Sequence, residues 1–233
     1  MTRPRRAGFA AAALIAAVLL AGLGVWQVER RVWKHDLVAA VEARLDAAPV
    51  AAPGPDAWPQ IDAKDDAYRR VTATGIFRHD RETLVQAVTE RGAGLWVLTP
   101  LETPRFTLLV NRGFVPANRR EPSTRAAGNV AGSVRVTGLL RVSEPGGAFL
   151  RDNDPAANRW FSRDVAAIAK ARGLGKVAPY FVDADAAPNP GGYPIGGLTI
   201  VHFRDHHLVY ALTWFALSAL SLFFAWRMWH SRD

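Results

Sequence analysis

The 233-residue sequence contains no cysteine and only two methionines, Met1 and Met228. The absence of cysteine excludes disulfides, thiolate-bound zinc, iron–sulfur clusters and covalently attached c-type haem. The shortage of thioether sulfur also argues against a copper chaperone that binds its metal through methionine. A metal bound by this chain would therefore need histidine as its protein ligand.

Signatures of several function classes are also missing. The net charge is +8, but the 29 Lys and Arg residues are scattered and form no basic stripe interleaved with aromatics, so nucleic-acid binding is not predicted. An anionic lipid surface or an acidic partner is the milder interpretation of the charge. The chain has no G-x-S-x-G, no H-E-x-x-H and no phosphate-binding glycine loop, so no enzyme activity is predicted.

Long apolar runs occur only at the two ends of the chain. Residues 9–26 are apolar throughout, and residues 208–226 are interrupted only by two serines, a threonine and a tyrosine. Each run is close in length to the ~20 residues that a helix needs to cross a bilayer. The first run is longer than the apolar region of a typical signal peptide and lacks a small-residue cleavage site, so we favour an uncleaved anchor over a cleaved signal. Two spans place both termini on the same side of the membrane.

Strand signals dominate the segment between these runs. Short stretches rich in β-branched and aromatic residues alternate with Gly, Pro, Asn and Asp, and they lie at 68–77, 83–88, 95–101, 106–115, 133–141, 179–184 and 198–203. One short helix is predicted at 164–172, ending at Gly173. The predicted fold class is a membrane-anchored α+β protein, with two transmembrane helices flanking a mostly antiparallel β-sheet or small open-barrel domain.

The motif "NRGFVP" places Asn111 and Arg112 at the end of an apolar strand. An arginine there could bind an anion. The alternative, which we favour, is a strand-to-turn exit in which Gly113 supplies an unusual backbone angle and nearby carbonyls satisfy Arg112.

The stretch "RDHHLVYALTWF" places two histidines at the start of the second span. Helical spacing predicts one stripe of polar and small residues there: His207, Tyr210, Ala211, Trp214, Ser218, Ser221 and Ala225. The first span offers a matching small surface: Ala13, Ala17, Ala21 and Gly24. Such stripes normally face protein, so a two-helix hairpin or docking on a larger membrane protein is expected. The chemistry alone leaves His206 and His207 open between interfacial anchors and metal ligands, and Trp26 and Trp33 open between a membrane-interface belt and a ligand site.

The chain resembles the Surfeit-locus cytochrome c oxidase assembly protein family. The resemblance begins at "LGVWQVERRVWKHDL" after the first span, continues through "YRRVTATGIF", "GLWVLTPL", "LLVNRGFVP", "VTGLLR" and "NDPAANRWFSRD", and ends at "HHLVYALTWF". It covers nearly the whole chain in order. Three positions depart from the family pattern, namely Phe114, Asp205 and Val209, where tryptophan, asparagine and glutamine are usual.

This resemblance implies a non-enzymatic assembly factor that binds haem a and assists its delivery to the catalytic subunit of cytochrome c oxidase. His207 falls on the family's expected histidine and is the candidate iron ligand, with Trp26, Tyr210 and Trp214 able to pack on a porphyrin plane. His206 lacks the match and is interpreted as an anchor. The haem would be held non-covalently and be transferable. Haem a synthase is a further candidate partner, besides membrane lipid. A structural scaffold that stabilises an oxidase assembly intermediate without binding haem is the alternative.

The resemblance, together with an Ala/Arg-rich composition, also implies a multi-pass protein of a bacterial inner membrane with its soluble domain in the periplasm. The chain is then expected to divide into a cytoplasmic N-terminus (1–8), a first transmembrane helix (9–27), a juxtamembrane helix and linker (28–66), an extracytoplasmic β-rich domain (67–205), a second transmembrane helix (206–227) and a cytoplasmic C-terminus (228–233).

Overall fold

The computed structural model describes residues 3–148, 150–199 and 205–230. The chain divides into two compact units. One comprises Met1–Ala40 with Val201–Asp233, and the other is Val41–Ile200.

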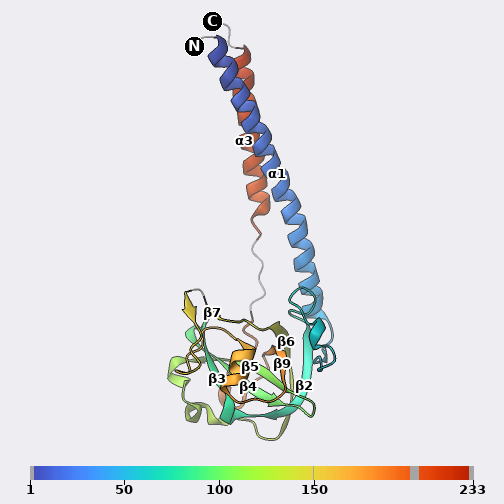
Figure 1. The fold of residues 1–233 in the computed structure, drawn as a ribbon, viewed down its shortest axis with the longest axis vertical. Helices are drawn as coiled ribbons and strands as arrows, with labels where there is room; N and C mark the ends of the chain where they lie inside the picture. The colour runs from blue at the N-terminus through green and yellow to red at the C-terminus, as the bar shows by residue number, and fades with distance from the viewer. Residues whose placement is uncertain (1–2, 149, 200–204, 231–233) are drawn as a thin grey trace. The chain divides into compact units, whose positions relative to one another are not determined.

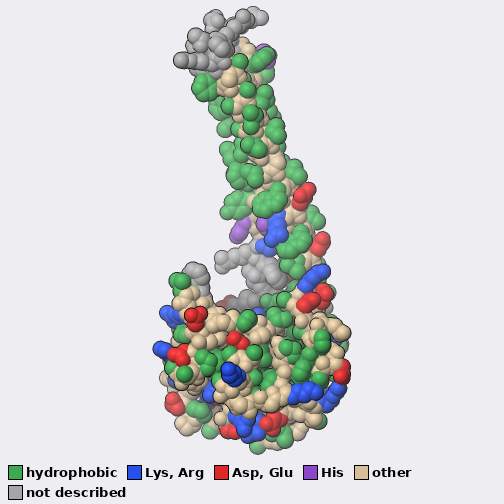
Figure 2. Space-filling model, viewed as in Figure 1, with side chains coloured by type: hydrophobic (Ala, Val, Ile, Leu, Met, Phe, Trp, Pro, Cys, Tyr) green, Lys and Arg blue, Asp and Glu red, His purple; other side chains and the backbone are tan. Residues whose placement is uncertain are grey.

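Two long helices make up the first unit. Helix α1 spans Arg3–Asp46, of which the part up to Ala40 belongs to this unit, and helix α3 spans His207–His230. They lie side by side and antiparallel, with the start of α1 next to the end of α3 (Figure 1). Both helices are long and apolar enough to cross a membrane, and apolar side chains cover much of their visible surface (Figure 2). They are the two candidate membrane spans of the protein.

The two helices meet along a heptad-spaced seam. Every described α3 residue that is not exposed lies on it, at alternating steps of four and three: His207, Ala211, Trp214, Ser218, Ser221, Ala225 and Met228. Buried and half-buried α1 positions repeat in the same way up to Gln27, which contacts the first residue of α3: Ala10, Ala13, Ala17, Leu20, Gly24 and Gln27. This period of 3.5 residues is that of antiparallel coiled-coil packing. The predicted small surfaces therefore do face each other, except that Tyr210 is exposed and that Leu20, not Ala21, occupies the α1 seam position.

Small residues bring the backbones of the seam close together. The hydroxyl of Ser218 donates a hydrogen bond of 2.8 Å to the backbone carbonyl of Ala17. Ala10, Ala17, Ala211 and Ala225 are each at most 4% exposed. Small side chains and interhelical hydrogen bonds are what drive helix association in lipid, where the hydrophobic effect between helices is absent.

Among its described residues the second unit contains nine strands and one helix of its own, besides the end of α1. The strands are β1 (Val50–Ala51), β2 (Arg70–Phe77), β3 (Thr83–Thr89), β4 (Gly92–Glu102), β5 (Thr107–Pro116), β6 (Ser133–Val142), β7 (Gly147–Ala148), β8 (Arg151–Asp152) and β9 (Val177–Ala184). Helix α2 spans Val165–Ala171, and the Asp164 side chain caps it by accepting from the amide of Ala167. Short 3-10 turns lie at Trp58–Gln60, His79–Arg81, Ala117–Arg119, Pro122–Gly128 and Pro190–Gly192.

Seven of these strands form one sheet in the order β1-β2-β6-β9-β5-β4-β3. An additional pairing of β2 with β4 closes the central five strands into a small barrel. All pairings are antiparallel except β1–β2 and β5–β9. The predicted mostly antiparallel fold is confirmed, and the barrel is closed. The predicted strand at 198–203 is not found at residues 198–199, and its remaining positions lie outside the described residues.

Strand β5 is buried on both of its faces, which explains its continuous apolar run. Leu108 and Val110 point into the barrel cluster with Leu140 and Tyr180. Leu109 points the other way, into a second cluster that α2 covers. Alternate side chains of a strand face opposite sides, and full burial of each leucine contributes roughly 1.5–3 kcal/mol. Helix α2, which follows the "NDPAANRWFSRD" segment, therefore covers a second hydrophobic core on the other face of β5.

A buried carboxylate ties several strands together. The side chain of Asp183 in β9 is 3% exposed. It accepts hydrogen bonds from Asn111 (2.7 Å), Arg141 (2.9 Å), Arg163 (3.0 Å) and Thr199 (2.9 Å). A buried charge is tolerated only when it is paired and hydrogen-bonded in this way. Asp183 thus fixes β5, β6, β9 and the segment before α2 relative to one another.

Candidate functional site

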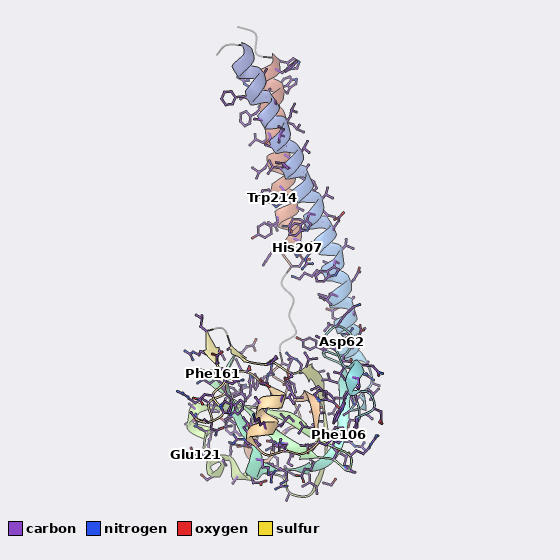
Figure 3. The ribbon with its side chains drawn as sticks, in the orientation of Figure 1. Asp62, Phe106, Glu121, Phe161, His207 and Trp214 are labelled. Atoms are coloured by element: carbon purple, nitrogen blue, oxygen red, sulfur yellow. The ribbon has the colours of Figure 1, made fainter. Side chains whose placement is uncertain are left out.

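His207 is the first residue of α3 and lies on the seam (Figure 3). Its Nδ1 is 2.7 Å from Oε1 of Gln27 on α1. His207 and Gln27 are both half-buried. No other hydrogen bond to the ring of His207 is found among the described residues, so Nε2 keeps its bonding capacity for a ligand.

Asp205 links the start of α3 to the continuation of α1. Its Oδ1 accepts from the backbone N–H of His207 at 2.9 Å, which satisfies one of the free amides at the start of the helix. Its Oδ2 lies 2.8 Å from Nε2 of His35 and 3.5 Å from Nε of Arg31. The His207 amide, followed by His35 and Arg31, holds the pKa of Asp205 below its usual range. Asp205, the acidic residue at the edge of the span, therefore connects the start of α3 to α1 through polar contacts.

The aromatic side chains predicted to accompany His207 differ in exposure. Trp214 lies on the seam and is half-buried, seven residues along α3 and hence on the same face as His207 (Figure 3). Tyr210 is 55% exposed and Trp26 is 53% exposed. The structure therefore places His207 and Trp214 on the seam, two helical turns apart, and leaves Trp26 and Tyr210 exposed.

An exposed cation–aromatic pair continues this surface along α1. The guanidinium carbon of Arg30 lies 3.9 Å from the ring centroid of Trp33, which is 51% exposed. Histidine and basic side chains gather at one place on the visible face of the helix pair, with apolar side chains on the helices beyond it toward the chain termini (Figure 2). A flat apolar group carrying negatively charged substituents matches the chemistry of this surface.

The described residues contain no group of three His, Cys, Asp or Glu side chains that could hold a metal ion. A metal bound at His207 would thus need most of its ligands from elsewhere. A porphyrin supplies four nitrogens and leaves axial positions for a protein side chain, so a single histidine with one open ring nitrogen fits a haem better than a free ion.

Sequence reasoning did not predict that Gln27 contacts His207. The two residues are 180 positions apart, and nothing local in either segment indicates the contact. The available signal was the seven-residue repeat of α1, which places Gln27 one step after Gly24 on the seam. The pairing of Asp205 with His35 and Arg31 was missed for the same reason.

Arg112 lies inside β5, which continues to Pro116, so the predicted strand-to-turn exit is wrong; nearby carbonyl groups do satisfy the arginine, as predicted. It is 3% exposed and donates to the carbonyl oxygen of Gly128 and, at 3.2 Å, to Oδ1 of Asn189. Gly113 has φ +128°, a conformation that favours glycine. Burial lowers the pKa of Arg112 to about 10. Carbonyl groups satisfy this arginine, so the anion-site interpretation is not needed.

The two apolar helices pack as an antiparallel pair, and the sequence between them folds into a small closed β-barrel. Together with the open ring nitrogen of His207 at the start of α3, these features define a membrane-anchored β-barrel protein with two candidate membrane spans. The SURF1 family model matches residues 14–219 of the chain. A SURF1-like protein of Monosiga brevicollis is 40% identical over 94% of this chain and 86% of its own length. Surfeit locus protein 1 of Homo sapiens is 38% identical, over 88% of this chain and 72% of its own. The corresponding mouse protein is 39% identical, over 85% and 68%.

The chain belongs to the SURF1 family. The three relatives come from eukaryotes, so the bacterial source expected from the sequence stays a prediction.

Proposed function

We propose that the protein is a non-enzymatic assembly factor that binds haem a at His207 and assists its delivery to the catalytic subunit of cytochrome c oxidase. One observation carries the proposal. Nδ1 of His207 is engaged by Gln27, whereas Nε2 has no partner among the described residues and lies at the part of the hairpin that carries exposed aromatics.

Each site residue has a distinct part in the proposal. The haem iron accepts the Nε2 lone pair, and the protein provides the rest of the binding energy. Trp214, half-buried on the same face of α3, and the exposed Trp26 and Tyr210 offer flat apolar surfaces for a porphyrin. Because the chain has no cysteine, the haem would be held without covalent attachment and could be passed on.

The proposed setting is a bacterial inner membrane. Both termini would lie in the cytoplasm and the barrel domain in the periplasm, on the side where α3 begins. Haem a synthase is a further proposed partner, because a carrier of haem a must receive it from the enzyme that makes it.

The test is to purify the full chain from cells that make haem a and to record its absorption spectrum. The proposal predicts co-purified haem a in stoichiometric amounts. The rival is a scaffold that stabilises an oxidase assembly intermediate, and the observation favouring it is that the His207–Gln27 bond also serves as a seam contact. A pure, folded protein without haem, from cells with ample haem a, would leave the scaffold as the better account.

A further inference from the structure

Gln27 is the side chain that determines how the His207 ring is held. It lies on the α1 seam three residues after Gly24, which packs against Phe215 of α3. This close approach of the helices brings the Gln27 amide within 2.7 Å of Nδ1. The ring of His207 has no second hydrogen-bond partner within the described part of the chain.

The orientation of the Gln27 amide sets the tautomer of His207. In the structure Oε1 faces the ring, and an amide oxygen only accepts a hydrogen bond. With this orientation the hydrogen of a neutral imidazole lies on Nδ1, and the lone pair is left on Nε2. A histidine that binds a metal usually donates its other ring N–H to such a partner, which orients the ring and tunes its basicity.

The partner is a neutral amide, although a carboxylate lies close by in the chain. Asp205 accepts from the backbone N–H of His207 and not from its ring, and its other oxygen is occupied by His35 and Arg31. An ionised acceptor makes hydrogen bonds about twice as strong as a neutral one does. The hydrogen bond to the neutral amide therefore polarises the His207 ring less than a bond to a carboxylate would. As a result, Nε2 is a weaker electron donor to iron.

We infer that Gln27 is a positioning residue for the haem ligand: it holds His207 with Nε2 open, and its neutral amide keeps the iron–nitrogen bond weak enough for release. This inference rests on the proposed function. A transferable cargo needs a ligand that is oriented in advance but does not bind as tightly as in a resident haem protein.

The first experiment needs no haem. In ¹⁵N-histidine-labelled, haem-free full-length protein in detergent, the His207 nitrogen shifts report which ring nitrogen carries hydrogen. We expect hydrogen on Nδ1 and a bare Nε2 in the wild type, and a mixture of tautomers in Gln27→Met. Hydrogen on Nε2 in the wild type, or the same tautomer in both proteins, overturns the inference.

The second experiment compares haem-loaded Gln27→Met, Gln27→Glu and, as control, Glu29→Leu, an exposed α1 site. Gln27→Met should weaken haem affinity about 10–100-fold. Gln27→Glu should keep the haem, lower its midpoint potential and slow its transfer to apomyoglobin. Glu29→Leu should match the wild type.

Unchanged affinity, potential and transfer in both Gln27 variants would reduce Gln27 to a packing residue. A wild type without haem would overturn the proposed function, and the tautomer measurement would then decide the role of Gln27 alone.

Discussion

Gly24 of α1 packs against the ring of Phe215 on α3 so closely that a Cβ added at residue 24 would lie 2.5 Å from Cε1 of the ring. At Gly22, two residues earlier on the same helix, an added Cβ would meet no atom within 4 Å. The two glycines therefore form a matched pair, one inside the helix–helix contact and one outside it.

Gly24→Leu should separate the helices and destabilise the hairpin by about 1–3 kcal/mol, the usual cost of overpacking. It should also lower haem occupancy, because Gln27 lies less than one helical turn away on the seam. Thermal unfolding in detergent and the haem spectrum measure the two effects. Gly22→Leu should change neither, and adding Phe215→Ala should restore part of the loss. Equal effects at both glycines would contradict the packing described here.

Asp183→Asn should destabilise the barrel domain by about 3–5 kcal/mol, because it removes the charge that pairs with two part-buried arginines. Denaturant unfolding followed by tryptophan fluorescence measures this loss. Asp152→Asn, at an exposed position of β8, serves as the control and should lie within about 0.5 kcal/mol of the wild type. A loss below 1 kcal/mol for Asp183→Asn would show that the network does not hold the strands together.

The barrel domain should lose stability in acid partly through Glu144. Burial alone would raise its pKa, but hydrogen bonds of 2.5 and 3.0 Å from Arg163 and the charge of that arginine outweigh it and hold the pKa below its ordinary value of 4.5. A carboxyl whose pKa is lower in the folded state stabilises above the unfolded pKa, and this contribution disappears as the pH falls through the folded pKa.

Stability measured from pH 6 downwards should therefore fall below about pH 4.5, and Glu144→Gln should flatten that part of the curve while lowering stability at neutral pH. Glu90→Gln, at an exposed position, should leave the curve unchanged. An identical acid slope in Glu144→Gln and the wild type would rule out this role.

The strands were predictable because their apolar alternation and their Gly, Pro, Asn and Asp boundaries are local signals. Closure of the barrel was not, since it needs Ile76 and Phe77 to reach the far end of β4, beyond the irregularity between Trp96 and Leu98. The stripe of α3 was predictable from helical spacing, yet spacing could not decide between Tyr210 and Ala211, which lie about 100° apart. The partner of His207 depends on the register between two helices distant in sequence, which no local pattern specifies.

The proposed topology has its own test in bacterial cells. Alkaline phosphatase fused at Ala127 should be active, and the same enzyme fused after Asp233 should be silent, because the barrel domain is placed outside the cytoplasm and the C-terminus inside. As the matched measurement, β-galactosidase fused at the same two positions should be active only after Asp233. Phosphatase activity only after Asp233 would invert the topology and place the start of α3 on the cytoplasmic side.

Haem a occupancy of His207→Ala compared with His206→Ala tests the central claim most directly. His206 is exposed and precedes the first residue of α3, so it is not one of the seam residues. His207→Ala should weaken haem binding more than Gln27→Met does, for which about 10–100-fold is expected, and its membrane insertion should be unchanged. His206→Ala should keep nearly all of the haem. Equal losses, or full occupancy in both variants, would contradict the assignment of His207 as the haem ligand.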